Sequence, residues 1–97
     1  MEIDHKDGYE LLIDAILSLK TREEAEHFLE DLMTRKEIAD SAQRMLVAKM
    51  LSEQIVYSKI AEETGASTAT ISRVNRAYQY GAGGYAMVLE RIIDKNK

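Results

Sequence analysis

The stretch of sequence that decides the fold is Tyr57-Ser-Lys-Ile-Ala-Glu-Glu-Thr-Gly-Ala-Ser-Thr-Ala-Thr-Ile-Ser-Arg-Val-Asn-Arg76. Two helices that cross over a tight turn need a small residue where they touch, and Ala61 supplies it. The turn needs a residue that adopts positive φ at little cost, and Gly65 supplies that four positions later. This spacing is typical of a helix-turn-helix, which we place at residues 57–78.

Apolar residues in the same stretch can hold the two helices together. Ile60 lies on the first helix, and Ile71 and Val74 are three positions apart on one face of the second. Ser67 precedes the second helix, where its hydroxyl can accept a hydrogen bond from the first turn. The spacing alone leaves one alternative open, namely two packed helices around a glycine turn with no role in DNA binding.

The residues of the second helix that do not face the first are Ser, Thr, Ala and Arg. A helix that enters the major groove places its N-terminal residues nearest the base edges. Arginine can bond guanine through two hydrogen bonds, and a threonine or alanine methyl can touch the methyl group of thymine. We therefore predict that the residues that read bases are Thr68, Ala69, Ser72, Arg73 and Arg76.

The charge distribution favours contact with DNA through the C-terminal part of the chain. Residues 1–40 carry 5 Lys/Arg against 12 Asp/Glu, whereas residues 41–97 carry 8 against 5, and no acid occurs from Gly65 to Leu89. The local field, rather than the net charge of −4, is what attracts phosphate. Ser58, Lys59 and Ser67 are suited to phosphate contacts, which position a protein without reading sequence.

The composition bounds the remaining possibilities. A chain of 97 residues is expected to form a single domain, 1–97.

Cysteine is absent, and His5 and His27 are isolated, so we predict no metal site. No nucleophile has a base at catalytic spacing, so we predict that the protein is not an enzyme. The N-terminal residues are polar, and no apolar run approaches the roughly 20 residues that span a bilayer. We therefore expect a cytoplasmic protein without membrane contact.

Helical periodicity covers most of the chain, and no alternating β-branched run indicates a strand. The expected helices lie near residues 8–19, 22–32, 35–51, 58–64, 67–78 and 84–94. Three of their starts match the capping-box pattern, in which a Glu stands three positions after the capping residue: Asp7–Glu10, Thr21–Glu24 and Thr34–Glu37. The glycine-rich residues 81–84 end one helix and release the next. The predicted fold class is all-α with six helices.

The first predicted helix is apolar on more than one side. One set recurs at helical spacing, and further apolar residues occupy other sides: Tyr9, Leu12, Ile13 and Ile16, then Leu11, Ala15, Leu17 and Leu19. Such a helix must be covered on nearly all sides, and a small domain has little core with which to cover it. We predict a homodimer whose dimerisation helices lie within residues 1–56. The alternative is that helices of the same chain suffice.

The segment Ala66-Ser-Thr-Ala-Thr-Ile-Ser-Arg73, set in a six-helix plan, resembles the tryptophan-repressor superfamily. Its continuation through residues 73–77 and Tyr80-Gly-Ala-Gly-Gly-Tyr85 looks like the YerC/YecD-type branch of that superfamily. The resemblance covers essentially the whole chain and is most specific over 60–85. It implies an intertwined homodimer that places two reading helices one DNA turn apart.

The resemblance also implies an effector pocket. Family members hold tryptophan with a threonine that opens the long helix, an arginine further along it and an arginine in the reading helix, which correspond to Thr34, Arg44 and Arg73. A second alignment places Gln43 where the first arginine should be. After the second arginine the repressor has a glycine, whereas this chain has Val74, whose branched side chain we expect to fill the pocket. We therefore predict no cofactor, with L-tryptophan as co-repressor the alternative.

Together these features predict a sequence-specific DNA-binding transcriptional regulator of the repressor type. It would act as a homodimer on double-stranded DNA with a pseudo-palindromic operator. The alternative is a non-enzymatic protein-interaction dimer whose helix-turn-helix is only structural and whose acidic residues 1–40 dock a partner. Binding to duplex DNA across a salt series separates the two, because only phosphate contacts give a steep salt dependence.

Overall fold

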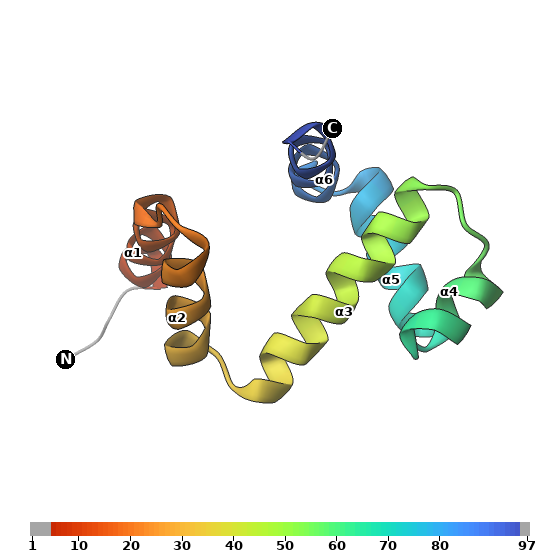
Figure 1. Cartoon of the computed structure of the whole chain (residues 1–97), viewed down its shortest axis with the longest axis horizontal. Coiled ribbons are helices and arrows are strands. Elements are labelled where there is room, and N and C mark those ends of the chain that lie inside the picture. The colour runs from red at the N-terminus through yellow and green to blue at the C-terminus, as the bar shows by residue number, and fades with distance from the viewer. Residues whose placement is uncertain (1–4, 96–97) are drawn as a thin grey trace. The chain divides into compact units, whose positions relative to one another are not determined.

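The protein is made of helices joined by short loops (Figure 1), in a computed structural model that describes residues 5–95 and the side chains of residues 6–93. The helices are α1 (His5–Ser18), α2 (Arg22–Leu32), α3 (Arg35–Ser52), α4 (Tyr57–Thr64), α5 (Thr68–Tyr80) and α6 (Gly84–Lys95). The described residues contain no strand. The predicted all-α class with six helices is therefore confirmed.

The chain divides into two compact units, residues 1–35 and residues 36–97. The first unit contains α1 and α2, and the second contains nearly all of α3 together with α4, α5 and α6. The boundary falls inside the segment 1–56 that the sequence assigns to dimerisation. The reason is that the C-terminal half of α3 packs with the helix-turn-helix, as the buried residues of α3 show.

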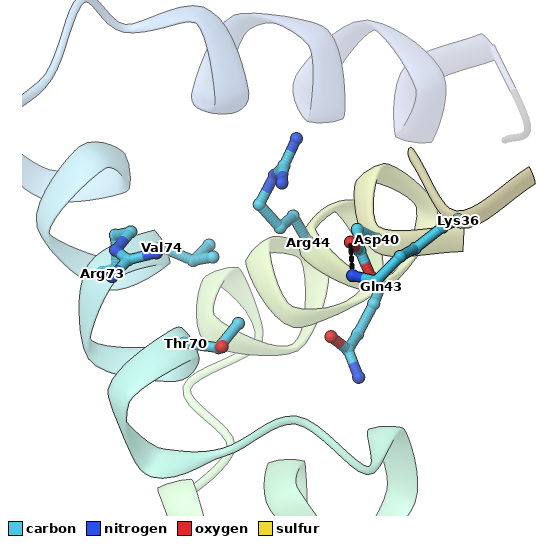
Figure 2. Close-up of a pocket in the computed structure, with 7 residues that line it drawn as sticks. All are labelled: Lys36, Asp40, Gln43, Arg44, Thr70, Arg73 and Val74. Carbon is cyan, nitrogen blue, oxygen red and sulfur yellow. Dashed lines mark hydrogen bonds and ion pairs between the residues drawn. The ribbon is translucent and has the colours of Figure 1, made fainter. Parts of the chain in front are cut away.

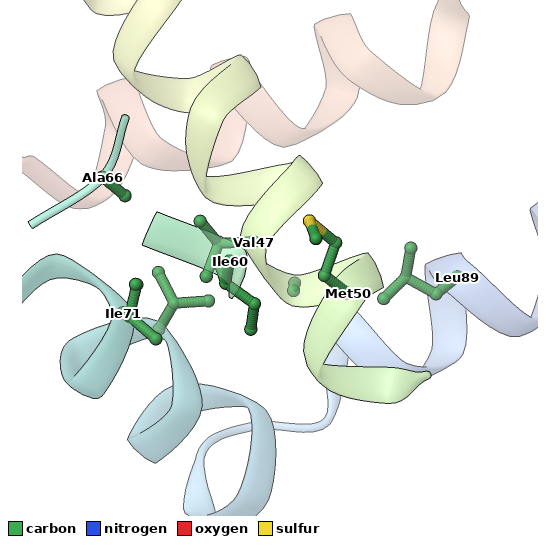
Figure 3. Packing of buried hydrophobic residues seen from close by; sticks show 8 residues of the cluster. Val47, Met50, Ile60, Ala66, Ile71 and Leu89 are labelled. Carbon is green, nitrogen blue, oxygen red and sulfur yellow. The ribbon is translucent and has the colours of Figure 1, made fainter. Parts of the chain in front are cut away.

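The buried side chains of the described residues all belong to the 36–97 unit and form one apolar cluster (Figure 3). The cluster comprises Val47, Ala48, Met50, Ile60, Ala66, Ile71, Val74 and Leu89. Ile60, Ile71 and Val74 were the residues predicted to seat the helix-turn-helix, and their burial confirms that prediction. Burying an aliphatic side chain of this size contributes about 1.5–3 kcal/mol. The cluster therefore fixes α4, α5 and α6 on α3.

The turn between α4 and α5 has the backbone conformation that the sequence predicts. Gly65 adopts a φ of 74° and its N–H donates to the carbonyl oxygen of Ala61 at 2.9 Å. The hydroxyl of Thr64 accepts a hydrogen bond from the N–H of Ala66 at 3.1 Å. The side-chain amide of Gln43 on α3 donates to the carbonyl oxygen of Thr64 at 3.1 Å. These bonds fix the direction in which α5 leaves the turn.

Two helix starts differ from the predicted capping boxes. α1 begins at His5, so Asp7 lies in its first turn rather than at its N-cap, and that predicted box is wrong. A carboxylate in the first turn still interacts favourably with the helix dipole, and no proline stops the helix from starting earlier. At α2 the hydroxyl of Thr21 accepts from the N–H of Glu24 at 3.1 Å, as predicted. The Glu24 carboxylate, however, accepts from the N–H of Lys20 at 3.0 Å instead of closing the box on Thr21.

The 1–35 unit has no buried side chain among its described residues. On one side of α1, Leu12, Ala15 and Leu19 are half-buried. On other sides Leu11 is 69% exposed and Leu17 is 76% exposed. Helices gain most of their stability from packing an apolar face, so these two helices need further cover to be stable in water.

The loop between α5 and α6 depends on a close approach of backbone to backbone. The N–H of Gly81 donates to the carbonyl oxygen of Ala77 at 3.0 Å, and a Cβ at Gly81 would overlap that oxygen. The loop then leads to α6, whose Leu89 lies in the core. In the part of the chain that the structure describes, every helix is too short or too polar to cross a bilayer.

Candidate nucleic-acid interface

The start of α5 is held by a side-chain cap. The hydroxyl of Ser67 accepts a hydrogen bond from the N–H of Thr70 at 3.1 Å and donates to the hydroxyl of Thr70 at the same distance. The predicted N-cap is therefore confirmed. Because the cap residue Ser67 and the first two residues of α5, Thr68 and Ala69, are exposed, the positive end of the helix dipole faces solvent.

The residues predicted to read bases lie on α5 and are exposed to solvent. They are Thr68, Ala69, Ser72, Arg73 and Arg76. At about 100° per residue these positions span an arc of about 140° around the helix. Ile71 and Val74 lie on the opposite side, in the core. The inner face of α5 thus holds the helix to the molecule while the outer face stays open.

The outer face of α5 carries positive charge without any acid. α5 contains no Asp or Glu, and within the described residues neither the Arg73 nor the Arg76 side chain has a hydrogen bond or an ion pair. Each guanidinium therefore has its full planar set of donors available. That geometry matches the two acceptors on the major-groove edge of guanine, and it also matches phosphate oxygens.

The residues predicted to contact phosphates lie at the starts of two helices. Ser58 and Lys59 are exposed in the first turn of α4, and Ser67 is exposed at the N-cap of α5. The Nζ of Lys59 lies 3.8 Å from Oε1 of Glu63, with both side chains more than half exposed. An exposed pair of this kind contributes only about 0.3–0.5 kcal/mol, so it would not hold Lys59 away from a phosphate.

A pocket of about 300 Å³ adjoins this face, between α3 and α5 (Figure 2). Its lining residues are Lys36, Asp40, Gln43, Arg44, Thr70, Arg73 and Val74. The Nζ of Lys36 lies 3.0 Å from Oδ2 of Asp40, and the guanidinium of Arg44 donates to the hydroxyl of Ser41 at 3.2 Å. Three cations against one carboxylate make the pocket positively charged.

The pocket brings together part of the set that the resemblance implies. Arg44 and Arg73 both line it, and so does Gln43, the residue of the second alignment. Thr34 belongs to the 1–35 unit, whereas the pocket is built by the 36–97 unit alone. Val74 lines the pocket without filling it, contrary to our expectation, because its side chain packs into the apolar cluster.

Three residues of the pocket were missed at the sequence level: Lys36, Asp40 and Thr70. A signal for two of them exists, because Lys36 and Asp40 precede Gln43 and Arg44 at the i, i+4, i+7, i+8 spacing that marks one helix face. The spacing does not say what that face meets. Only the packing of α3 on α5 places Thr70 opposite it.

A chain whose glycine turn leads into a capped helix with an open, acid-free, arginine-bearing face is a helix-turn-helix protein. The family model of the Trp repressor protein matches residues 7–93, and the chain belongs to that family. It is 53% identical over 94 residues to the uncharacterised protein YerC of Bacillus subtilis, with 95% of this chain and 90% of YerC covered. The resemblance seen in the sequence is thereby confirmed.

Two crystal structures share the fold at substantial sequence identity. One is a TrpR-like protein from Eubacterium eligens, 56% identical, with a TM-score of 0.84 and 89% of each chain covered. The other is a Staphylococcus aureus protein provisionally called a Trp repressor, 48% identical, with a TM-score of 0.84, 89% of this chain and 86% of that chain covered. The six-helix arrangement is therefore that of Trp repressor-like proteins.

Proposed function

We propose that the protein is a sequence-specific DNA-binding transcriptional regulator of the repressor type, which acts in the cytoplasm, as a homodimer and without enzymatic activity. The observation that carries the proposal is the outer face of α5. It is exposed, free of acids and bears Arg73 and Arg76, whose side chains have no partner among the residues that the structure describes. Membership of the Trp repressor family supports it.

In this proposal α5 enters the major groove and its outer face reads the bases. Arg76 would bond guanine, Ser72 would serve as a polar contact, and Thr68 and Ala69 would touch thymine methyl groups. Arg73 lies at the edge of the face, next to the pocket. The starts of α4 and α5, with Ser58, Lys59 and Ser67, would bind phosphates and set the depth of α5 in the groove. These roles follow from helical phase and exposure.

The homodimer is proposed from the state of the 1–35 unit. That unit lacks a buried side chain among its described residues, yet α1 exposes large apolar side chains. A second copy of the chain carries the same exposed apolar surface and could therefore cover it. Closed twofold dimers are also the commonest oligomers. Two copies of α5 related by a twofold axis would read a pseudo-palindromic site.

The proposal is tested by binding to duplex DNA across a salt series. The logarithm of the binding constant should fall linearly with the logarithm of salt concentration, with a slope of about −0.9 for each phosphate contacted. Specific duplex should bind about a thousandfold or more tighter than random duplex. No measurable binding to duplex at low salt would contradict the proposal.

A second candidate function is a protein-interaction dimer in which the helix-turn-helix is structural. It is favoured by one observation, the acidic and exposed surface of α2, which carries Glu23, Glu24, Glu26, Glu30 and Asp31. A basic partner could dock on that surface. The salt series separates the two candidates, since this one predicts no binding to DNA.

We propose that the regulator needs no cofactor. The lining of the pocket supports this, because it contains no aromatic residue and Val74 is its one apolar residue. Isothermal titration calorimetry with L-tryptophan tests it. We expect no heat of binding, and saturable binding in the micromolar range would show that the co-repressor alternative is correct.

A further inference from the structure

The pocket between α3 and α5 is lined by the N-terminal half of α3, whereas the C-terminal half of α3 contributes to the apolar core. Along α3, Lys36, Gln43, Val47 and Met50 lie within about 60° of one another around the helix axis. Val47 and Met50, in the C-terminal half of α3, are buried in the apolar cluster. In the N-terminal half the same face becomes polar and ends in Lys36. The face that packs against α5 at one end therefore opens into a charged pocket at the other.

The positive charges on the polar part of this α3 face are not neutralised by acidic residues of α5, which has none. The pocket residues that α5 contributes are Thr70, Arg73 and Val74, of which one is cationic and none acidic (Figure 2). On α3, Lys36 is paired with Asp40 at 3.0 Å, which leaves the charge of Arg44 without an acidic partner among the described residues. Arg44 and Arg73 therefore both line the pocket, and neither side chain is paired with a carboxylate among the described residues.

The lining indicates the class of ligand. Pockets for aromatic or other organic ligands are lined mostly by apolar and aromatic side chains, whereas Val74 is the one apolar residue here. Guanidinium groups bind phosphate oxygens through paired hydrogen bonds, and a threonine hydroxyl can add another. Arg73 also borders the outer face of α5, so the pocket opens beside the surface proposed to meet DNA.

We propose that this pocket holds a phosphate group of the DNA backbone, bound by Arg44 and Arg73, and that it thereby positions α5 in the groove without an effector. This inference rests on the proposed DNA-binding function and deepens it. Arg44 acts here as a positioning residue, because it binds backbone and not bases. Asp40 limits the strength of the site, since its carboxylate repels a phosphate and is only partly offset by Lys36.

The first test substitutes Arg44→Gln, which removes the charge and keeps a polar, unbranched side chain. The variant should bind every duplex about tenfold more weakly for each pocket that contacts DNA, because a charge-assisted hydrogen bond is lost. The salt slope should fall by about 1 per pocket, and the preferred sequence should stay the same. The matched control is Lys49→Gln, an exposed cation on the same helix that lies outside the pocket.

The second test substitutes Asp40→Asn and has the opposite expected sign. Removing the carboxylate should tighten binding to all duplexes several-fold, because the phosphate no longer meets a like charge. Its control is Glu26→Gln on α2, which removes an exposed acid of the other unit. Unfolding cannot imitate a gain of affinity, so this variant keeps the proposal testable even if Arg44→Gln is poorly folded.

The outcomes of these experiments distinguish a failure of the phosphate-site proposal from a failure of the proposed DNA-binding function. If the wild type binds duplex and Arg44→Gln behaves like Lys49→Gln, the phosphate site is wrong and the regulator stands. If the wild type binds DNA only after L-tryptophan or inorganic phosphate is added, the pocket holds a free ligand and the inference is overturned. If the wild type binds no duplex at all, the proposed function fails, and this inference fails with it.

Discussion

Gly65 sets the direction of the chain between the end of α4 and the start of α5, because its φ of 74° lies in the left-handed region. A Cβ at this position would meet no atom within 4 Å, so the cost of a side chain is conformational and not steric. We expect Gly65→Ala to lower the free energy of unfolding by about 1 kcal/mol, measured by urea denaturation at fixed protein concentration.

The matched control for that variant is Gly8→Ala. Gly8 also has open space around its Cα, but it lies within α1 and has no positive φ. Alanine should raise stability there by up to about 1 kcal/mol, because glycine is the poorer helix former. Equal effects at the two positions would show that the conformation of Gly65 is not what the turn requires.

Arg76 lies near the centre of the outer face of α5 and has no protein partner within the described residues. We expect Arg76→Ala to lower affinity for the preferred duplex by about tenfold to a hundredfold, since a paired contact to guanine is worth about 1–3 kcal/mol. Affinity for random duplex should change far less. Competition binding with both duplexes measures the difference, with Arg91→Ala on α6 as the control. An unchanged preference would mean that Arg76 does not read bases.

At the scale of the element, α5 depends on its cap as well as on its buried face. The hydroxyl of Ser67 accepts from the N–H of Thr70 at 3.1 Å, and Ser67→Ala leaves that N–H without the bond. We expect a loss of about 1 kcal/mol in the free energy of unfolding. Ser58→Ala, in the first turn of α4, is the control and should change stability by less than about 0.5 kcal/mol. Similar losses for both variants would argue against a stabilising cap.

The elements could be predicted from the sequence wherever the signal is local. The positive φ of Gly65, the cap at Ser67 and the burial of Ile71 follow from spacing and residue type, and the structure confirms them. The start of α1 was predicted too late, because a capping pattern at Asp7 competes with a helix that nothing stops from beginning earlier. A capping-box pattern indicates where a helix can start, and the residues before it determine whether the helix does start there.

The residues of the pocket could be predicted only in part, because which helix faces meet depends on tertiary packing and not on local sequence. Arg44 and Arg73 were found through the family resemblance, but Lys36 and Asp40 were missed. Their shared helix face is visible in the sequence, yet its partner surface is set by the packing of α3 on α5. The side-chain direction of Val74 likewise depends on that packing, which is why it lines the pocket without filling it.

At the scale of the whole molecule, the exposed apolar side chains of α1 are the basis for the proposed homodimer. Leu17 is 76% exposed on α1, in a unit whose described residues include no buried side chain. We expect the wild type to sediment as a dimer and Leu17→Glu to shift the equilibrium toward monomer by about tenfold or more, because a charge would be placed in an apolar interface. Sedimentation equilibrium measures the shift, and Glu10→Gln on the same helix is the control. A wild type that is monomeric at high micromolar concentration would contradict the dimer.

The proposed regulator must present the outer faces of two copies of α5 to duplex DNA. Selection of bound sequences from a random duplex pool tests it most directly, because it reports the sequence read by each copy and the distance between the two. We predict an inverted repeat whose half-sites are centred about 10–10.5 base pairs apart, one turn of the double helix. Recovery of no enriched sequence, or of a single half-site without a symmetric mate, would contradict it.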